Sequence, residues 1–168
     1  QLRVMQELLE NAGSAQLKVR VDALSIGVFA LKPSVKADAI SELRRCHLWY
    51  DYFGVPQPRA ARAESDQHTD LASDMGRAVH SIPGYVALSK YFVILAPPVV
   101  HKDTGRILDY TSWTGRGWCR LERLGRALSP TETHILFADG TSTLQELGAQ
   151  EYIVAPVGTA NFTVEADR

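Results

Sequence analysis

The chain has 168 residues, 45% of them hydrophobic and 22% charged, and its formal net charge is −1. This composition is typical of an ordinary globular protein, so residues 1–168 are expected to form a single domain with a sizeable core. A net charge near zero argues against bulk electrostatic binding to nucleic acid or a membrane surface, and no apolar run approaches the ~18 residues of a membrane span. The chain begins at Gln1 within a helical pattern, which indicates a piece of a longer polypeptide.

The N-terminal half shows helical and strand patterns in alternation. Apolar residues recur at helical spacing in three segments, residues 2–12, 33–43 and 70–82. Residues 17–31 combine alternation with a solid apolar run, so a strand and a buried helix both remain open there. Residues 47–53 are rich in aromatic side chains, which favours a strand ended by Pro56. The polar segment 58–69 is predicted to be a mobile loop, and Pro83 is expected to break the third helix.

The C-terminal half is dominated by short apolar runs typical of buried strands. Two such runs cover residues 91–96 and 134–138, with a connecting loop at 99–110 and a helix after it. A short helix is predicted at residues 143–147. The predicted strands are expected to be parallel neighbours in one sheet with helices on both faces, at residues 47–53, 91–96, 133–138 and 152–155.

The helix within residues 111–128 carries the densest set of functional residue types. At about 100° per residue, its apolar residues gather on one face that is expected to be buried, namely Trp118, Leu121, Leu124, Gly125 and Leu128. Arg116, Arg120 and Arg123 gather on the opposite face, which is expected to meet solvent or an anionic partner. Glu122 lies at the seam between the two faces.

The position of Glu122 allows two interpretations. A carboxylate at the seam can point into a cleft, where partial burial would raise its proton affinity. Alternatively, Glu122 forms a surface ion pair with Arg126, four residues on, that contributes only about 0.3–0.5 kcal/mol. Helix geometry alone favours the ion pair.

Other potential sites give weaker signals. Residues 114–117, Thr-Gly-Arg-Gly, precede a helix, so backbone N–H groups and Arg116 are candidates for holding an anion. The alternative is a plain glycine turn that lets Trp118 pack. Asp51 is expected at the carboxyl end of a strand, where ligands bind in open parallel sheets, and the helix of Glu122 should begin at the same edge.

Neither metal chemistry nor a reactive thiol is indicated. No CxxC, HxxxH or HExxH spacing is present, so no metal site is expected. Cys46 and Cys119 form no disulfide framework and are interpreted as reduced thiols of an intracellular, cytoplasmic protein. Cys119 lies beside the apolar face of its helix and is expected to be a small core residue.

Residues 118–124, Trp-Cys-Arg-Leu-Glu-Arg-Leu, resemble the Trp-Cys-x-x-Glu-Leu signature of TIR (Toll/interleukin-1 receptor and resistance protein) domains, although Arg123 stands where the family prefers leucine. Residues 78–96 are similar to the family's Ala-Ile … Ser … Val-Val-Leu-Ser run, and residues 49–51 to its second strand, which ends near an aspartate. The match covers about residues 45–140. Fungal incompatibility (HET-type) modules show comparable Trp-x-Asp and Arg-x-Trp patterns, so a HET-like effector is a third, weaker interpretation.

The sequence departs from the TIR pattern in three places. The family's first strand is not seen ahead of Gln1, and Pro97-Pro98 replaces the usual serine after the third strand. A longer segment than usual also separates the first helix from Trp49. The resemblance implies a flavodoxin-like three-layer α/β fold around a mostly parallel five-strand sheet, with the first strand missing from this piece.

The resemblance also implies a reaction. Glu122 matches the family's catalytic glutamate, which acts in cleaving nicotinamide from NAD, here a substrate and not a cofactor. Asp51, Tyr110 and Arg116 would then line the substrate site. A carboxylate suits this chemistry because breaking the glycosidic bond builds positive charge on the ribose.

Many TIR domains are instead non-catalytic and act by self-association. The second hypothesis is therefore an assembly module that binds itself or other TIR-like domains. Such a module would use a partner-binding loop at residues 56–62 and the basic face of the helix of Trp118, although a plain connector at 56–62 is equally compatible with the sequence.

Overall fold

The computed structural model describes residues 1–14, 16–21, 26–27, 35, 40–56, 74–130, 134–148 and 153–162. The α-helices in these ranges are α1 (Leu2–Gly13), α4 (Asp51–Gly54), α5 (Asp74–Leu88), α6 (Tyr110–Thr114) and α7 (Gly117–Ala127). The strands are β1 (Lys18–Val21), β2 (Tyr91–Leu95), β3 (Val99–Val100), β4 (Ile107–Leu108), β5 (His134–Ala138) and β6 (Thr143–Glu146). Two 3-10 helices are η1 (Glu42–Arg45) and η3 (Val157–Thr159).

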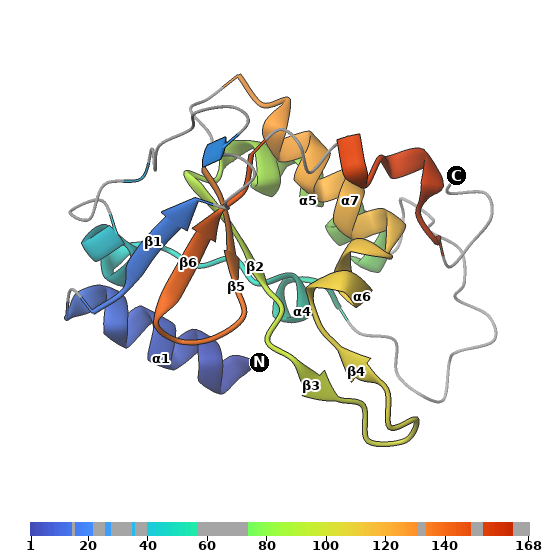
Figure 1. The fold of residues 1–168 in the computed structure, drawn as a ribbon. Coiled ribbons are helices and arrows are strands. Elements are labelled where there is room, and N and C mark those ends of the chain that lie inside the picture. The colour runs from blue at the N-terminus through green and yellow to red at the C-terminus, as the bar shows by residue number, and fades with distance from the viewer. Residues whose placement is uncertain are drawn as a thin grey trace.

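The main sheet has four strands in the order β1-β6-β5-β2 (Figure 1). β1 pairs with β6 and β2 pairs with β5 in parallel, whereas β5 and β6 are antiparallel. The sequence-based prediction of a mixed α/β domain with a mostly parallel sheet is confirmed. The predicted strands at 91–96 and 134–138 are present and are parallel neighbours in register, with Tyr91 opposite His134.

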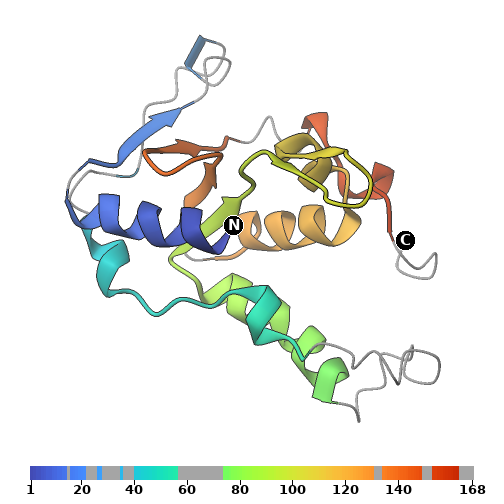
Figure 2. The same ribbon diagram turned by 90° about the horizontal axis from the view of Figure 1, so that it is seen from below.

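Helices lie on both faces of this sheet (Figures 1 and 2). On one face, α1 and η1 enclose a core of Leu8, Ala12, Leu17, Val35, Ile40, Leu43, Leu136, Ala138 and Leu144. On the other face, α6 and the end of α7 cover Ile94, Ala96 and Ile135. These two apolar layers hold the sheet between the helices because burying their side chains removes apolar surface from water.

Two predicted strands and one predicted helix are wrong. Residues 47–50 have no regular structure and are followed by the short helix α4, because Trp49 stacks on Tyr85 of α5 at 5.1 Å between ring centroids and is not part of the sheet. Ile153 and Val154 are helical and 77% and 78% exposed, so no core strand runs through 153–155. Residues 143–146 form strand β6 and not a helix, because Leu144 is fully buried between β1 and β5.

Several boundaries also differ from the sequence-based expectations. Helix α5 continues through Pro83 to Leu88, and the expected loop at 99–110 contains the β3–β4 hairpin. Gly105 has a φ of 66° in the hairpin turn, a conformation that favours glycine. Within the undecided segment 17–31, residues 18–21 form β1.

Several predictions fall outside the described residues. These are the loop at 58–69, most of the proposed partner loop at 56–62, and most of the second predicted helix at 33–43. Among the described residues, no helix is both long and apolar enough to span a membrane.

Helix α7 is turned differently from the orientation that its sequence predicted. Trp118, Leu121 and Leu128 are 39%, 42% and 75% exposed, whereas Arg123 and Arg126 are 1% and 0% exposed. The predicted buried face is therefore wrong. The arginines are buried because their guanidinium groups donate to backbone carbonyl oxygens, Arg123 to Ala155 and Arg126 to Val86 and Ala87. Hydrogen-bonded partners of this kind make a buried charge tolerable.

Arg120, expected to be exposed, is half-buried. Its guanidinium donates to the carbonyl oxygens of Thr114 and Pro156 and to the hydroxyl of Thr159, at 2.6 and 2.8 Å for the last two contacts. Arg120 therefore joins α7 to η3. Trp118 meets Phe162 edge to face, with 6.4 Å between ring centroids.

Two glycines of α7 should respond in opposite ways to alanine. A Cβ on Gly117 would lie 2.3 Å from Cζ of Phe162, so we expect Gly117→Ala to lower the free energy of unfolding by about 1–3 kcal/mol. A Cβ on Gly125 would meet nothing within 4 Å, so Gly125→Ala should raise it by about 0.5–1 kcal/mol through helix propensity. Urea unfolding of both variants checks this, and a loss of equal size in both would contradict the Phe162 contact.

Candidate functional site

Glu122 lies in the middle of α7 with a half-buried side chain. Burial is the main cause that raises the pKa of its carboxyl from the ordinary 4.5 to about 7. The negative charge of Asp51 raises this pKa further, and the positive charge of Arg116 opposes the shift. The described residues contain no ion pair between Glu122 and Arg126, because the Arg126 guanidinium donates to the end of α5.

Asp51 comes from a distant part of the chain, as the first residue of α4. It does not end a strand, as its sequence context predicted, but its charge still acts on both Glu122 and Cys119. The charges of Asp51 and Arg116 thus both act on the Glu122 carboxyl. Glu122 is the half-buried member of the three, whereas Asp51 and Arg116 are exposed. A partly buried carboxyl with a raised pKa and a charged neighbour of each sign is a candidate functional group.

Cys119 is buried one turn before Arg123, as expected for a small core residue. Burial raises the pKa of its thiol to about 11, with Arg116 lowering it and Glu122 and Asp51 raising it. The thiol therefore stays protonated at neutral pH, and a protonated thiol is a poor nucleophile. We conclude that Cys119 belongs to the packing beneath the site and not to its chemistry.

Arg116 is the N-cap of α7 and its backbone is extended. The C-terminal segment holds it in place, because Asn161 donates to the Gly115 carbonyl at 3.0 Å and accepts from the Gly117 N–H at 2.7 Å. The Gly117 N–H is thereby occupied and unavailable to an anion. Gly117 itself is required by the ring of Phe162, not by Trp118 as the glycine-turn interpretation supposed.

A cavity of about 150 Å³ opens at the carboxyl end of β2, and Arg116 forms part of its wall. It is lined by Gln1, Leu95, Ala96, Pro97, Val99, Leu108, Asp109, Ser112, Trp113 and Arg116. A capping box fixes the wall at the start of α6, where the Ser112 N–H donates to Asp109 Oδ1 at 3.0 Å and the Asp109 N–H donates to Ser112 Oγ at 2.8 Å. Glu122 is not among these lining residues, but Arg116 both lines the cavity and acts on the pKa of Glu122 through its charge.

Tyr110 contacts α7, α6 and β5. Its hydroxyl accepts a hydrogen bond from Arg123 Nη1 at 3.2 Å, and its ring contacts Trp113 and Phe137. These contacts place Tyr110 in the apolar layer beneath α6 and α7. The candidate site is therefore Glu122, Asp51 and Arg116, together with the cavity beside Arg116.

Sequence reasoning missed the Asp109–Ser112 pair and Trp113, which form the cavity wall. The pattern Asp-x-x-Ser ahead of a helix is a recognisable cap signal and would have placed a helix start there. It gives no sign of a cavity, because the opposite wall comes from β2 and Gln1. Among the described residues, no group of three His, Cys, Asp or Glu could hold a metal ion.

Neither a protein-family model, nor a curated protein, nor a solved structure matches this chain.

Stability should depend on pH through Glu122. Because burial raises the pKa of Glu122 in the folded state, the folded chain holds this proton more tightly than the unfolded chain does. The stability that the protonated carboxyl contributes is therefore fully present below about pH 4.5 and is lost as the pH rises through about 7. We therefore expect Glu122→Gln to raise the free energy of unfolding by about 1–3 kcal/mol near pH 8 and to change it little near pH 4. Urea unfolding at both pH values measures this difference.

A matched control for this experiment is Glu10→Gln, which removes an exposed carboxyl from α1. It should not reproduce the gain near pH 8. Equal stability of wild type and Glu122→Gln at both pH values would mean that the Glu122 carboxyl is as well solvated as a surface group.

Proposed function

We propose that this chain is a TIR-like intracellular signalling or defence module that hydrolyses NAD to nicotinamide and ADP-ribose, with Glu122 as the catalytic carboxylate. The observation that carries the proposal is the half-buried Glu122 carboxyl, with its raised pKa, in electrostatic reach of Arg116 and Asp51. The resemblance of residues 118–124 to the TIR signature supplies the reaction. A flavodoxin-like arrangement is part of the same proposal, supported by the parallel β2–β5 pair between two helical layers.

The chemistry needs an anion that is poorly solvated. When the bond between ribose C1′ and the nicotinamide nitrogen breaks, its electron pair leaves with nicotinamide and the ribose becomes oxocarbenium-like. An ionised Glu122 would stabilise that charge more strongly in a partly desolvated position than in water. Water then adds to C1′ and loses a proton, which completes the hydrolysis.

The cavity suits only part of the substrate. Its volume of about 150 Å³ is below the ~300–1,000 Å³ of a typical ligand pocket, so the adenine end would occupy it while the rest of NAD extends past Arg116 and brings the nicotinamide ribose to Glu122. Arg116 stands at the boundary and would meet the pyrophosphate, for which a guanidinium is a good partner.

The test is nicotinamide release from NAD, followed by chromatography at high protein concentration, with Glu122→Ala as the control. Wild-type turnover that is lost in Glu122→Ala supports the proposal. The absence of nicotinamide release from the wild-type chain at every protein concentration contradicts it.

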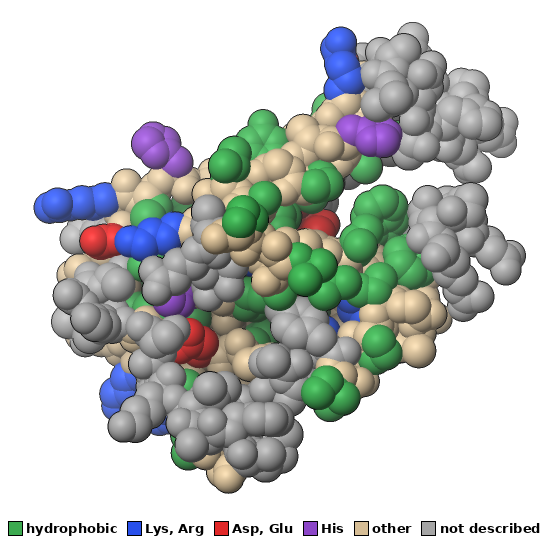
Figure 3. Space-filling model, turned by 90° about the horizontal axis from the view of Figure 1, so that it is seen from above, with side chains coloured by type: hydrophobic (Ala, Val, Ile, Leu, Met, Phe, Trp, Pro, Cys, Tyr) green, Lys and Arg blue, Asp and Glu red, His purple; other side chains and the backbone are tan. Residues whose placement is uncertain are grey.

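The alternative is a non-catalytic assembly module on the same fold. It is favoured by exposed apolar side chains on α4, α5 and α7, namely Phe53 (66%), Tyr85 (47%), Leu88 (86%), Leu121 (42%) and Leu128 (75%). Seen from above, hydrophobic side chains line a hollow between α5 and α7 with an acidic side chain at its inner end (Figure 3). Exposed apolar side chains gathered around a hollow often mark a protein contact. Concentration-dependent self-association without any nicotinamide release would favour this alternative.

A further inference from the structure

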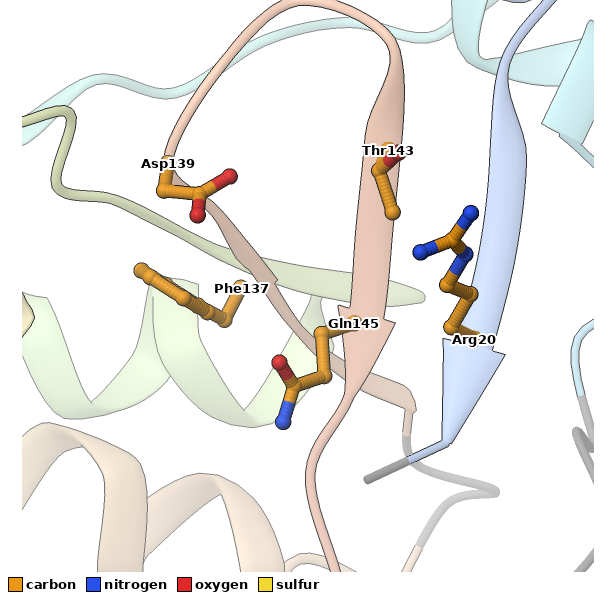
Figure 4. A pocket seen from close by; sticks show the side chains of 5 residues that line it. All are labelled: Arg20, Phe137, Asp139, Thr143 and Gln145. Carbon is orange, nitrogen blue, oxygen red and sulfur yellow. The ribbon is translucent and has the colours of Figure 1, made fainter. Parts of the chain in front are cut away.

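A second concave site lies on the sheet itself, over β1, β6 and β5 (Figure 4). The apolar layer beneath α6 and α7 reaches Ile135 and Phe137 of β5. Further toward the β1 edge, strand alternation places Arg20, Thr143 and Gln145 on this same face, while Val19 and Leu144 point into the core beneath α1. On this face, β1 and β6 thus offer a polar surface, whereas β5 and β2 offer an apolar one.

The cavity on this surface has a volume of about 210 Å³ and is lined by Arg20, Phe137, Asp139, Thr143 and Gln145. Figure 4 shows the Arg20 guanidinium and the Asp139 carboxylate pointing toward one another across β6, with Thr143 between them. Among the described residues, neither charged side chain forms a hydrogen bond or an ion pair. The two charges therefore face a shared space without neutralising each other.

We propose that this cavity binds a free α-amino acid as a zwitterion. Arg20 would hold the carboxylate, for which its planar donors are suited, and Asp139 would hold the ammonium group. Thr143 and Gln145 also line the cavity, and Phe137 offers an apolar surface to the side chain. A simple anion would be repelled by Asp139 and a simple cation by Arg20, so a ligand that carries both charges fits best.

Size supports a small ligand. The volume of about 210 Å³ is below the ~300–1,000 Å³ of pockets for drug-sized molecules. The cavity is therefore too small to enclose a dinucleotide. The cavity shares no lining residue with the one beside Arg116. The amino-acid site is therefore separate from the proposed NAD site and does not depend on it.

Three probes that share a phenyl ring and differ in their charged groups test the proposal by titration calorimetry on the full chain. L-phenylalanine carries both charges, phenethylamine lacks the carboxylate and 3-phenylpropanoate lacks the ammonium group. We expect L-phenylalanine to bind about 10- to 100-fold more tightly than either analogue, as loss of one charge-assisted hydrogen bond implies. Binding of either analogue as tight as that of L-phenylalanine, or no saturable binding of L-phenylalanine, overturns the proposal.

Substitutions then assign each charge to its partner. Arg20→Gln should weaken L-phenylalanine about 10- to 100-fold and tighten phenethylamine, because the repulsion of its ammonium group is removed. Asp139→Asn should weaken L-phenylalanine and tighten 3-phenylpropanoate for the corresponding reason. Binding of the analogue that is at least as tight as in wild type shows that the cavity is intact. Lys18→Gln, an exposed change on the same strand outside the cavity, is the matched control and should bind as wild type does. Equal losses in Lys18→Gln and Arg20→Gln would contradict a specific role for Arg20.

Discussion

Arg126→Ala is expected to lower the free energy of unfolding by about 3–5 kcal/mol, a large fraction of the ~5–15 kcal/mol available to a domain. Arg126 is fully buried, and its Nη1 donates to the carbonyl oxygens of Ala87 at 2.8 Å and Val86 at 3.4 Å. These carbonyl groups belong to the last turn of α5, where a helix leaves its carbonyl groups without an internal partner. A positive charge there also complements the helix dipole.

The alanine variant would leave a cavity and at least one buried carbonyl group without its donor. Ser129 Oγ also donates to the Ala87 carbonyl at 3.0 Å, so the Val86 carbonyl should suffer most. Urea unfolding measures the loss, with Leu128→Ala as the matched control, because Leu128 is 75% exposed at the end of the same helix. The control should change stability by less than about 0.5 kcal/mol. A loss below about 1 kcal/mol for Arg126→Ala would show that Arg126 does not hold α5 to α7.

Glu122→Gln is expected to slow nicotinamide release by about a hundredfold or more, the usual effect of removing one electrostatic stabiliser of a transition state. The amide keeps the size of the carboxyl and removes the charge that would stabilise the oxocarbenium-like ribose. Initial rates at equal concentrations of folded protein measure the effect. Because the same change should stabilise the fold near pH 8, unfolding cannot account for the lost rate.

Two further variants serve as controls for the rate of Glu122→Gln. Glu10→Gln, the exposed change on α1, should leave the rate unchanged. Arg116→Gln should weaken substrate binding more than it slows turnover, because Arg116 lies at the cavity wall where the pyrophosphate is placed by the proposal. A Glu122→Gln rate within about threefold of the wild-type rate would remove Glu122 from the reaction.

The sequence predicted best those elements whose pattern is strong and local. α1 and α7 were recognisable from helical spacing, and β2 and β5 from continuous apolar runs. β6 was missed because it contains a single apolar residue, Leu144, whose burial comes from neighbouring strands. Residues 47–50 were wrongly predicted as a strand because their aromatic side chains favour strands, whereas Trp49 stacks on helix α5 and not on a sheet.

Helical periodicity did not predict which face of α7 is buried. Arginine normally marks a solvent face, yet Arg123 and Arg126 are buried because carbonyl groups from residues 86, 87 and 155 reach them. Nothing within residues 111–128 encodes those partners. The same limit applies to the site, because the partial burial of Glu122 was a possibility at the helix seam, whereas a pKa of about 7 requires the tertiary environment that includes Asp51.

The most direct test of the account is the pH profile of nicotinamide release by the wild-type chain and by Glu122→Gln, from about pH 5 to about pH 9. The ionised carboxylate is the active form, so the wild-type rate should rise with pH around a midpoint near 7, the raised pKa of Glu122. The rise should be missing in Glu122→Gln. No nicotinamide release at any pH, or the same profile in both proteins, would contradict the assignment of Glu122 as the catalytic carboxylate.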